Sequence, residues 1–288
     1  MGNKERPEWL KKRINLDENY QKTAQVLKDL ELNTVCQAAF CPNLGECFRA
    51  GVATFMILGN VCSRNCKFCD IANGTPESIN ENEPANIKEA VARMGLEHVV
   101  ITSVTRDDLQ DGGSKHFVSV IKSLKEINNL NIEVLTPDFK GDYTDIKRVV
   151  KAKPDVYNHN IETIPRLYSN IRSEAKYQRS LQLLKTVKEI DNNIITKSGL
   201  MLGLGEKEAE VISVLQDLKD VNCDILTIGQ YLQPSDQHAE LKEYIIPDKF
   251  AEYRKIALKL GFKAVAAKPF VRSSYQAKKL YQKAKENS

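Results

Sequence analysis

The sequence predicts an α/β fold, a partial (β/α)6 TIM-type barrel with N-terminal and C-terminal extensions. From about residue 52 onward, short runs rich in β-branched residues alternate with segments whose apolar residues recur at helical spacing, which is typical of repeated βα units and a parallel sheet. Six such units can be recognised, too few for the roughly eight strands of a complete barrel. A chain of 288 residues is long enough to bury a core of this kind.

Each expected strand is a short apolar run, and a segment with one apolar helical face follows it. The expected strands are ATFMIL (53–58), HVVITSV (98–104), IEVLTPD (132–138), VYNHNI (156–161), ITKSGLM (195–201) and DILTIGQYL (224–232). The apolar helical positions are Ile87, Val91, Met94, Phe117, Val120, Ile121, Leu124, Leu183, Val187, Ile190, Val211, Leu215, Leu218, Phe250, Tyr253, Ala257 and Leu260. We expect both sets to form the core. Because the carboxyl ends of parallel strands meet at one edge, ligands should bind there.

The chain divides into three stretches. Residues 52–266 carry the alternation and are expected to form the barrel, while residues 1–51 and 267–288 lack it and are expected to pack on the barrel as extensions. No low-complexity linker separates the three, which favours one cooperative domain.

Composition excludes several classes of function. A formal net charge of +4 is too small to indicate a nucleic-acid partner. No run approaches the roughly 18 apolar residues that cross a bilayer, and the first residues carry charges where a signal peptide is apolar. We therefore expect a soluble cytoplasmic protein that binds no membrane.

The seven cysteines are the main chemical signal. In a reducing cytoplasm, clustered cysteines indicate metal ligands or catalytic thiols rather than disulfides. Six of them fall between residues 36 and 69. The seventh, Cys223, borders an expected strand, where a thiol is expected to pack as a small buried hydrophobe.

Three cysteines occupy the stretch GNVCSRNCKFCD, and no fourth lies near them. Cys62, Cys66 and Cys69 give the spacing CxxxCxxC. A structural zinc site and an electron-transfer cluster both normally close with four ligands, so three thiolates on a four-iron cluster would leave one iron open. Zinc is the alternative. The motif, with Phe68 as its aromatic residue, resembles that of the radical S-adenosylmethionine enzymes. The resemblance implies a 4Fe-4S cluster whose open iron binds S-adenosylmethionine and cleaves it to a 5′-deoxyadenosyl radical.

A second triad, Cys36, Cys41 and Cys47, lies in TVCQAAFCPNLGECF. Scattered structural cysteines are the alternative to a second cluster. Together with the sequence RSSY (272–275), this triad resembles the lipoyl synthase family. The resemblance also covers DDLQDGG (107–113), NHNIET (158–163), KSGLMLGLGE (197–206) and IGQYLQPS (228–235). Lys268 and Phe270 depart from the family pattern, so local packing is expected to differ there.

The resemblance implies two 4Fe-4S clusters. Ser274 would be the fourth protein ligand of the auxiliary cluster beside the triad Cys36, Cys41 and Cys47, and Arg272 would orient the cluster loop or pair with a carboxylate. Serine oxygen is a harder donor than thiolate and should bind iron less tightly. That suits a cluster that is dismantled as the sulfur source.

The implied reaction is a sulfurtransferase reaction. Two sulfur atoms would enter at C6 and C8 of a protein-bound N6-octanoyl-lysine, with S-adenosylmethionine as cosubstrate. The implied carriers are the glycine-cleavage H protein and the acyltransferase subunits of 2-oxoacid dehydrogenases, and flavodoxin or ferredoxin would donate electrons. The alternatives are another sulfur-inserting enzyme, of the biotin synthase type, or an iron–sulfur electron carrier.

Further residues are candidate contacts of S-adenosylmethionine: Phe68, Ser103, Asn160, Glu162, Arg172, Gly203 and Gly205. Asn160 and Glu162, two apart on one expected strand end, could bind ribose hydroxyls or only cap the sheet. Arg172 could meet the methionine carboxylate or only a surface acid. Gly203 and Gly205 are expected to allow close backbone approach.

Overall fold

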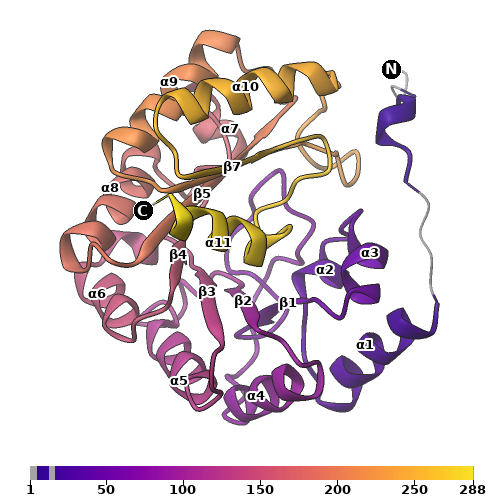
Figure 1. The fold of residues 1–288 in the computed structure, drawn as a ribbon, viewed down its shortest axis with the longest axis vertical. Coiled ribbons are helices and arrows are strands. Elements are labelled where there is room, and N and C mark those ends of the chain that lie inside the picture. The colour runs from indigo at the N-terminus through magenta and orange to yellow at the C-terminus, as the bar shows by residue number, and fades with distance from the viewer. Residues whose placement is uncertain (1–4, 13–16, 288) are drawn as a thin grey trace.

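Seven parallel strands form one sheet in the order β1-β2-β3-β4-β5-β6-β7 (Figure 1). Their bounds are β1 Thr54–Ile57, β2 His98–Ser103, β3 Asn131–Leu135, β4 Val156–Asn158, β5 Ile195–Leu202, β6 Ile225–Gln230 and β7 Ala264–Ala267. This computed structural model describes residues 5–12 and 17–287. The predicted extensions include residues 1–4, 13–16 and 288, which lie outside the described residues. Within the described sheet, β1 and β7 are the two edges, so the predicted partial barrel is confirmed.

Helices connect successive strands because parallel pairing requires a crossover. The crossover helices are α4 Glu83–Arg93, α5 Ser114–Leu124, α6 Tyr143–Lys151, α8 Tyr177–Ile190, α9 Glu208–Asp220 and α10 Pro247–Lys259, which lie around the outside of the sheet (Figure 1). The short helices in the loops are η2 Phe139–Gly141, η3 Pro165–Leu167 and α7 Tyr168–Ile171. Nearly all of the predicted apolar helical positions are buried, which confirms their place in the core.

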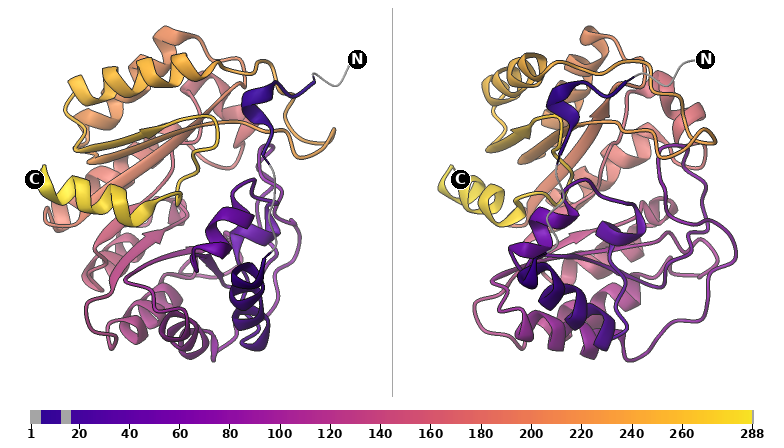
Figure 2. Two further views of the ribbon diagram at one scale, coloured as in Figure 1. Left: turned by 45° about the vertical axis from the view of Figure 1, so that its right-hand side comes forward. Right: turned by 90° about the vertical axis from the view of Figure 1, so that its right-hand side faces the viewer.

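The C-terminal helix α11, Ala277–Glu286, covers the amino-terminal end of the strands. Its Leu280, Tyr281 and Ala284 form a separate apolar cluster with residues at or near the starts of four strands, Val156, Ile195, Ile225 and Ala264. In the left view of Figure 2, α11 (yellow) lies across one end of the strands. The opposite, carboxyl end is left for the loops that carry the predicted site.

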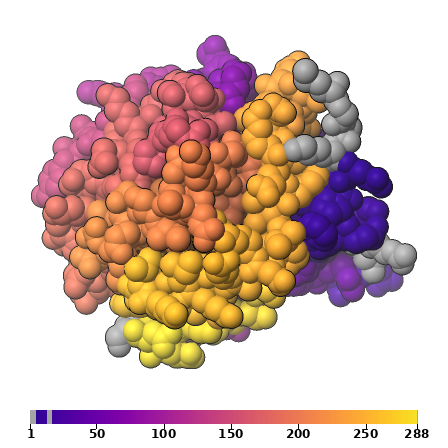
Figure 3. Space-filling view, turned by 90° about the horizontal axis from the view of Figure 1, so that it is seen from above, coloured from indigo at the N-terminus to yellow at the C-terminus, as the bar shows by residue number. Residues whose placement is uncertain are grey.

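The N-terminal segments are η1 Glu8–Leu10, α1 Glu18–Asp29, α2 Val35–Ala38 and α3 Leu44–Arg49. Of these, α2 lies against β1, and α1 packs on α3. Asp17 caps α1 by accepting a hydrogen bond from the backbone N–H of Tyr20, and Thr34 caps α2 in the same way from Gln37. The first described residues (indigo) lie against the C-terminal part of the chain (orange) in Figure 3.

Two details differ from the expected elements. β7, with the sequence AVAA, was not predicted, because alanine has a low preference for strands and only one β-branched residue is present. β4 ends at Asn158 rather than at residue 161, and the backbone turns at Glu162, whose φ is +66°. The expectation that Asn160 and Glu162 share a strand is therefore wrong.

Candidate functional site

The triad Cys62, Cys66 and Cys69 lies in the loop that follows β1, at the carboxyl end of the strands. The Sγ of Cys62 accepts hydrogen bonds from the backbone N–H groups of Arg64 (3.4 Å) and Thr105 (3.3 Å). Such N–H contacts stabilise a metal-bound thiolate. The backbone of Cys62 also pairs with Ala72 and Gly74, which closes the loop on itself. We refer to these three cysteines as the barrel triad.

A buried ion network anchors this loop. Arg64, inside the motif, contacts Asp107 at 2.6 Å and Asp138 at 2.8 Å, and Arg179 of α8 contacts the other oxygen of Asp138 at 2.7 Å. Burial alone would raise the pKa of the Asp138 carboxyl, but the Arg64 guanidinium lowers it to about 2. The network joins the cysteine loop to the ends of β2 and β3. Sequence reasoning missed it, although Arg64 lies within the motif itself.

A second loop closes over the barrel triad from the opposite side. The ring of His238 is 3.0 Å from the backbone oxygen of Cys69, and the N–H of Ala239 donates to the backbone oxygen of Lys67 at 2.7 Å. The N–H of Lys67 donates to Ile171 of α7 at 2.9 Å. The loop is thus fixed at several backbone positions before any ligand binds.

Burial raises the pKa of two thiols in each cysteine triad. The pKa rises for Cys66 and reaches about 12 for Cys69 in the barrel triad. It reaches about 11 for Cys36 and about 12 for Cys47 upstream, again chiefly through burial. These four thiols are therefore neutral without metal, so metal binding must displace their protons.

Several candidate contacts of S-adenosylmethionine gather near the barrel triad. Cys66 lies within electrostatic range of Arg172 and Glu162. Burial raises the pKa of the Glu162 carboxyl, while Arg172 and a hydrogen bond with Asn160 oppose the rise. Arg172 donates to the backbone oxygen of Asn160 at 2.9 Å, so it meets no surface acid in this structure. Phe68, which lies in the same loop as the barrel triad, is partly buried against the core.

Two buried polar atoms support a polar ligand here. The Oγ of Ser103, at the carboxyl end of β2, and the Nε of Arg172 have no hydrogen-bond partner among the described residues. A buried polar group without a partner costs stability, so both atoms fit a cosubstrate that would supply the missing bonds.

Gly203 has a packing explanation, and Gly205 has a conformational one. A Cβ at Gly203 would lie 2.3 Å from the side-chain nitrogen of Gln230 and 2.5 Å from the backbone oxygen of Glu243, so Gly203 lets both residues pack at the end of β5. A Cβ at Gly205 would make only ordinary contact with the side chain of Lys242, but the φ of Gly205 is +96°, a conformation that other residues rarely adopt. Their approach to S-adenosylmethionine stays a prediction.

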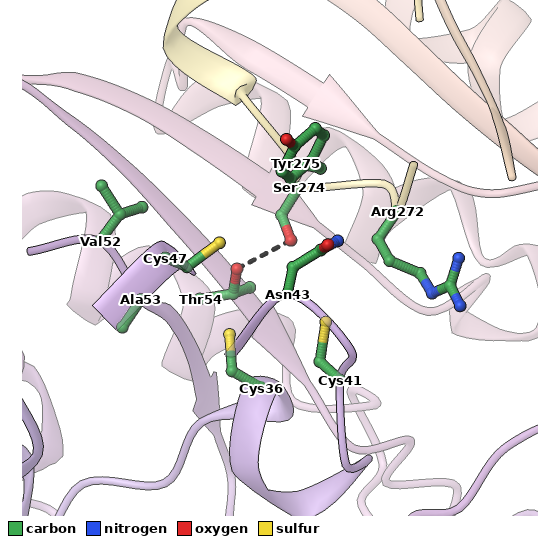
Figure 4. Close-up of a pocket in the computed structure, with 10 residues that line it drawn as sticks. All are labelled: Cys36, Cys41, Asn43, Cys47, Val52, Ala53, Thr54, Arg272, Ser274 and Tyr275. Carbon is green, nitrogen blue, oxygen red and sulfur yellow. Dashed lines mark hydrogen bonds between the residues drawn. The ribbon is translucent and has the colours of Figure 1, made fainter. Parts of the chain in front are cut away.

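The second triad lines one pocket together with Ser274, although the two are more than 200 residues apart in the sequence. Cys36 lies on α2, Cys47 on α3 and Cys41 between them, and their sulfur atoms face a common space (Figure 4). The hydroxyl of Ser274 faces the same space and is 2.8 Å from that of Thr54 in β1. We refer to Cys36, Cys41 and Cys47 as the upstream triad.

Arg272 lies at the edge of the same pocket (Figure 4). It donates to the backbone oxygen of Val271 at 2.8 Å, and burial lowers the pKa of its guanidinium. It lies within electrostatic range of Cys41 and of Glu162. Arg272 and Glu162 therefore link the surroundings of the upstream triad to those of the barrel triad.

A surface clamp covers the upstream triad. Lys12 contacts Glu46 at 2.6 Å and the side-chain oxygen of Asn43 at 2.8 Å, and its ammonium lies over the ring of Phe270. The hydroxyl of Tyr275 donates to the other oxygen of Glu46 at 2.7 Å. We call Lys12, Glu46, Phe270 and Tyr275 the N-terminal clamp. Phe270 is one of the two departures from the family pattern, and it gives Lys12 an aromatic face.

The donor chemistry of both triads fits iron–sulfur clusters. Within the described ranges, no three His, Cys, Asp or Glu side chains converge on a position for a single metal ion. A four-iron cluster does not need such convergence, because each of its irons takes its own protein ligand. Soft thiolates with one open position suit the barrel triad, and thiolates with one hydroxyl oxygen suit the upstream triad.

The remaining side chains of interest are structural. His159 is buried between the backbone oxygen of Thr136 and the hydroxyl of Ser180, both at 2.9 Å. Asp108 pairs with Arg106 at 2.8 Å. The thiol of Cys223 is fully buried in the core, as the sequence predicts.

Family models match both parts of the chain. The radical SAM superfamily model matches residues 56–218, and the model for the N-terminal domain of lipoyl synthase matches residues 2–41. A lipoyl synthase of Caldanaerobacter subterraneus is 57% identical over 272 residues, which cover 94% of this chain and 95% of the relative. A lipoyl synthase of Alkaliphilus metalliredigens is 53% identical over 287 residues, 99% of each chain.

The chain belongs to the lipoyl synthase family. The chain also belongs to the radical SAM superfamily. It is therefore an enzyme that requires a 4Fe-4S cluster and S-adenosylmethionine. Solved structures show the same fold at low identity. Methylornithine synthase aligns with a TM-score of 0.59 at 15% identity, covering 84% of this chain and 74% of that one. The hydrogenase maturase HydG also gives 0.59, at 14% identity, covering 86% and 63%.

Proposed function

We propose that this enzyme inserts two sulfur atoms at C6 and C8 of an N6-octanoyl-lysine on a carrier protein, and so forms N6-lipoyl-lysine. The observation that carries the proposal is the pocket in which Ser274 meets Cys36, Cys41 and Cys47. Membership of the lipoyl synthase family supports it. The sulfur source would be an auxiliary 4Fe-4S cluster on these four ligands.

The barrel triad would bind the first cluster. When bound, the reduced cluster and S-adenosylmethionine supply a carbon-centred radical that removes hydrogen from an unactivated carbon. The protein contributes position: the Arg64 network fixes the cysteine loop, and Arg172, Asn160 and Glu162 present polar atoms beside it. Ser103 and Arg172 would bind the cosubstrate through their unpartnered atoms.

The upstream triad and Ser274 would bind the auxiliary cluster. Arg272 places a buried positive charge beside Cys41, where it would offset the negative charge of thiolate ligands. The substrate chain would enter between the two sites, near Glu162 and Arg272.

The two competing functions make different demands. A biotin synthase type of enzyme would take auxiliary ligands from cysteines in the barrel strands, yet none of the seven described strands contains a cysteine. An electron carrier would need no pocket that joins a serine to three thiols. Neither alternative is favoured by a specific observation.

We also propose the partners and the compartment. The carriers would be the glycine-cleavage H protein and the acyltransferase subunits of 2-oxoacid dehydrogenases, and the electron donor a flavodoxin or ferredoxin. The reaction would take place in the cytoplasm, where thiols stay reduced; all seven cysteines are unpaired in the structure. No helix among the described residues is long and apolar enough to cross a membrane.

The test is an anaerobic reconstitution. Wild-type protein, with about eight irons per chain expected for two four-iron clusters, is incubated with an octanoylated lysyl peptide, reductant and S-adenosylmethionine. Mass spectrometry should detect the peptide with two added sulfurs. An iron-loaded protein that makes 5′-deoxyadenosine but never a sulfur-bearing peptide would refute the proposal.

Two matched variants separate the triads. Cys36→Ala should still form 5′-deoxyadenosine but no lipoyl product, whereas Cys62→Ala should form neither. If Cys36→Ala alone lost 5′-deoxyadenosine formation, the assigned roles of the two triads would be reversed.

A further inference from the structure

The interior of the barrel contains a buried ion pair that the fold does not require. Lys197 of β5 and Glu133 of β3 are both fully buried, and their nitrogen and oxygen atoms are 2.7 Å apart. Removing two charges from water is costly, and apolar side chains of similar size often replace such a pair without loss of stability. A buried pair at this place therefore calls for a role beyond stability.

The side-chain amide of Asn158 connects this ion pair to the C-terminal loop. Asn158, at the end of β4, donates from its side-chain nitrogen to Glu133 at 3.2 Å and to the hydroxyl of Ser273 at 2.7 Å. The Ser273 hydroxyl in turn donates to the side-chain oxygen of Asn160 at 2.9 Å. The Ser273 hydroxyl thus accepts one hydrogen bond and donates another at the wall of the barrel.

Two glycines give this loop its place inside the barrel. A Cβ at Gly229 in β6 would lie 2.0 Å from the backbone oxygen of Val271, which no real contact permits. A Cβ at Gly199 in β5 would lie 2.5 Å from the hydroxyl oxygen of Thr227 in β6 and 3.0 Å from the side-chain oxygen of Asn160, the acceptor of the Ser273 bond. Gly229 therefore makes room for the backbone of Val271, and Gly199 makes room for both Thr227 and Asn160.

The hydrogen bonds of Ser273 fix the direction of its neighbour. Ser273 is held on β4, while the hydroxyl of Ser274 faces Thr54 of β1 and the upstream triad. One loop therefore spans the gap between two strands that are not neighbours in the sheet. If the Ser273 bonds were lost, the single hydrogen bond with Thr54 would be left to direct the Ser274 hydroxyl at the pocket.

We propose that Ser273 is a positioning residue for the auxiliary cluster: docked on Asn158 and Asn160, and supported by the Glu133–Lys197 pair, it holds Ser274 at the upstream triad. This inference rests on the proposed function, because it takes Ser274 as an iron ligand. Ser273 is not itself proposed as an iron ligand, because its hydroxyl is bonded to Asn158 and Asn160.

A pair of variants equal in shape tests the role of the hydroxyl. Ser273→Thr keeps a donor and acceptor, whereas Ser273→Val has the same shape without them. We expect the Val variant to lose about 10–100-fold in auxiliary-cluster retention and in lipoyl product relative to Thr, the range seen when a supporting hydrogen bond of a metal ligand is removed. Formation of 5′-deoxyadenosine should stay the same in both. Ser273→Ala serves as the second variant if the β-branched pair folds poorly.

Spectroscopy provides a readout that a merely structural role would not move. Mössbauer spectra of iron-57 protein should show that the Val or Ala variant has lost the signal of the oxygen-ligated iron, as Ser274→Ala does, while the Thr variant keeps it. Equal spectra for the Val, Ala and wild-type proteins would overturn the proposal. So would a loss of 5′-deoxyadenosine formation equal to the loss of product, because that would indicate general damage.

Hydrogen exchange separates this inference from the proposed function. In the metal-free protein, the backbone amides of residues 273–276 should exchange faster in the Val variant than in the Thr variant, and those of the barrel triad loop should not change. Wild-type protein that makes no lipoyl product refutes the proposed function. Equal exchange in the two variants refutes the docking role of Ser273, whatever the product assay shows.

Discussion

The two cysteine triads are built in different ways. The barrel triad lies in one short loop after β1, and buried charges tie that loop to β2, β3 and α8. The upstream triad lies on two short helices outside the barrel and on the turn between them, and its fourth candidate ligand, Ser274, comes from the opposite end of the chain. The cysteines of one site all come from a single loop, whereas the ligand set of the other exists only when distant segments meet.

This difference suits the two proposed roles. A cluster that serves in every turnover benefits from a rigid loop and a single open position. A cluster that gives up its sulfur must be dismantled and rebuilt, and a site assembled from separate segments with a weaker oxygen ligand can open without unfolding the barrel. The contacts that hold each site can be broken separately.

Removing the anchor of the barrel triad should have the largest effect. Asp138→Asn leaves the buried guanidiniums of Arg64 and Arg179 without their shared charge, so the free energy of unfolding should fall by about 3–5 kcal/mol in urea titrations. Formation of 5′-deoxyadenosine should fall as well, because the cysteine loop loses its support. The matched control is Asp108→Asn, whose partly exposed pair with Arg106 should contribute about 1 kcal/mol or less. Equal effects of the two changes would contradict the assigned anchor.

Acid should weaken the support of both triads. Although burial alone would raise it, the Lys197 ammonium lowers the pKa of the Glu133 carboxyl from 4.5 to about 2, and His98 faces the same carboxylate. A lowered pKa stabilises the fold above the unfolded value near 4.5, and this contribution is lost as the pH falls toward 2. It amounts to about 3 kcal/mol.

Urea titrations between pH 6 and pH 3 measure this loss. Glu133→Gln should be less stable than wild type at pH 6, and its stability should fall less steeply with acid because one titrating carboxylate is gone. A variant that follows the wild-type slope would show that Glu133 does not keep its low pKa. The pKa of the Asp138 carboxyl is also about 2, so Asp138→Asn should likewise lose stability less steeply with acid than wild type does. In this variant the titrating group that is lost belongs to the anchor of the barrel triad.

The sequence predicted the three cysteines of the barrel triad more completely than the charged residues that anchor their loop. The spacing of Cys62, Cys66 and Cys69 indicated the chemistry, since all three ligands are local. Six strands were predicted from β-branched runs, while β7 was missed because three of its four residues are alanines, which carry little strand signal. Arg64 lies within the motif, but its partners Asp107 and Asp138 follow other strands, and no spacing rule connects them.

The close spacing of Cys36, Cys41 and Cys47 predicted a second cluster, but Ser274 could be predicted as its fourth ligand only through resemblance. Nothing in the spacing of its cysteines indicates that Ser274 completes the pocket, because the contact depends on the whole barrel bringing the chain back to β1. In the same way, no spacing in the sequence indicates that Asn158, Ser273 and Gly229 belong to one site. Their roles follow from side chains that meet inside the barrel, and periodicity reveals only that the strands are buried.

Filling the space at Gly229 should disturb the upstream triad alone. Gly229→Ala places a methyl group against the backbone of Val271, so the loop that carries Ser274 must move. Overpacking of this kind costs about 1–3 kcal/mol. Lipoyl product should be lost while 5′-deoxyadenosine formation continues, as measured by chromatography of the same reactions. A parallel loss of both products would show that the two triads are not independent.

The smallest effect should come from the N-terminal clamp. Lys12→Met removes a partly exposed ion pair with Glu46 and the contact with the Phe270 ring, so the free energy of unfolding should fall by only about 0.5–1 kcal/mol. The clamp lies over the upstream triad, so a chelator should remove iron faster from that site than in wild type, while the barrel cluster keeps its wild-type rate. Lys11→Met, which removes only an exposed pair with Glu8, is the control and should change neither rate. Equal acceleration at both clusters would mean that the clamp does not guard the upstream site specifically. Faster loss of iron from the upstream cluster alone would show that the N-terminal clamp, although it adds little stability, controls access to the upstream site.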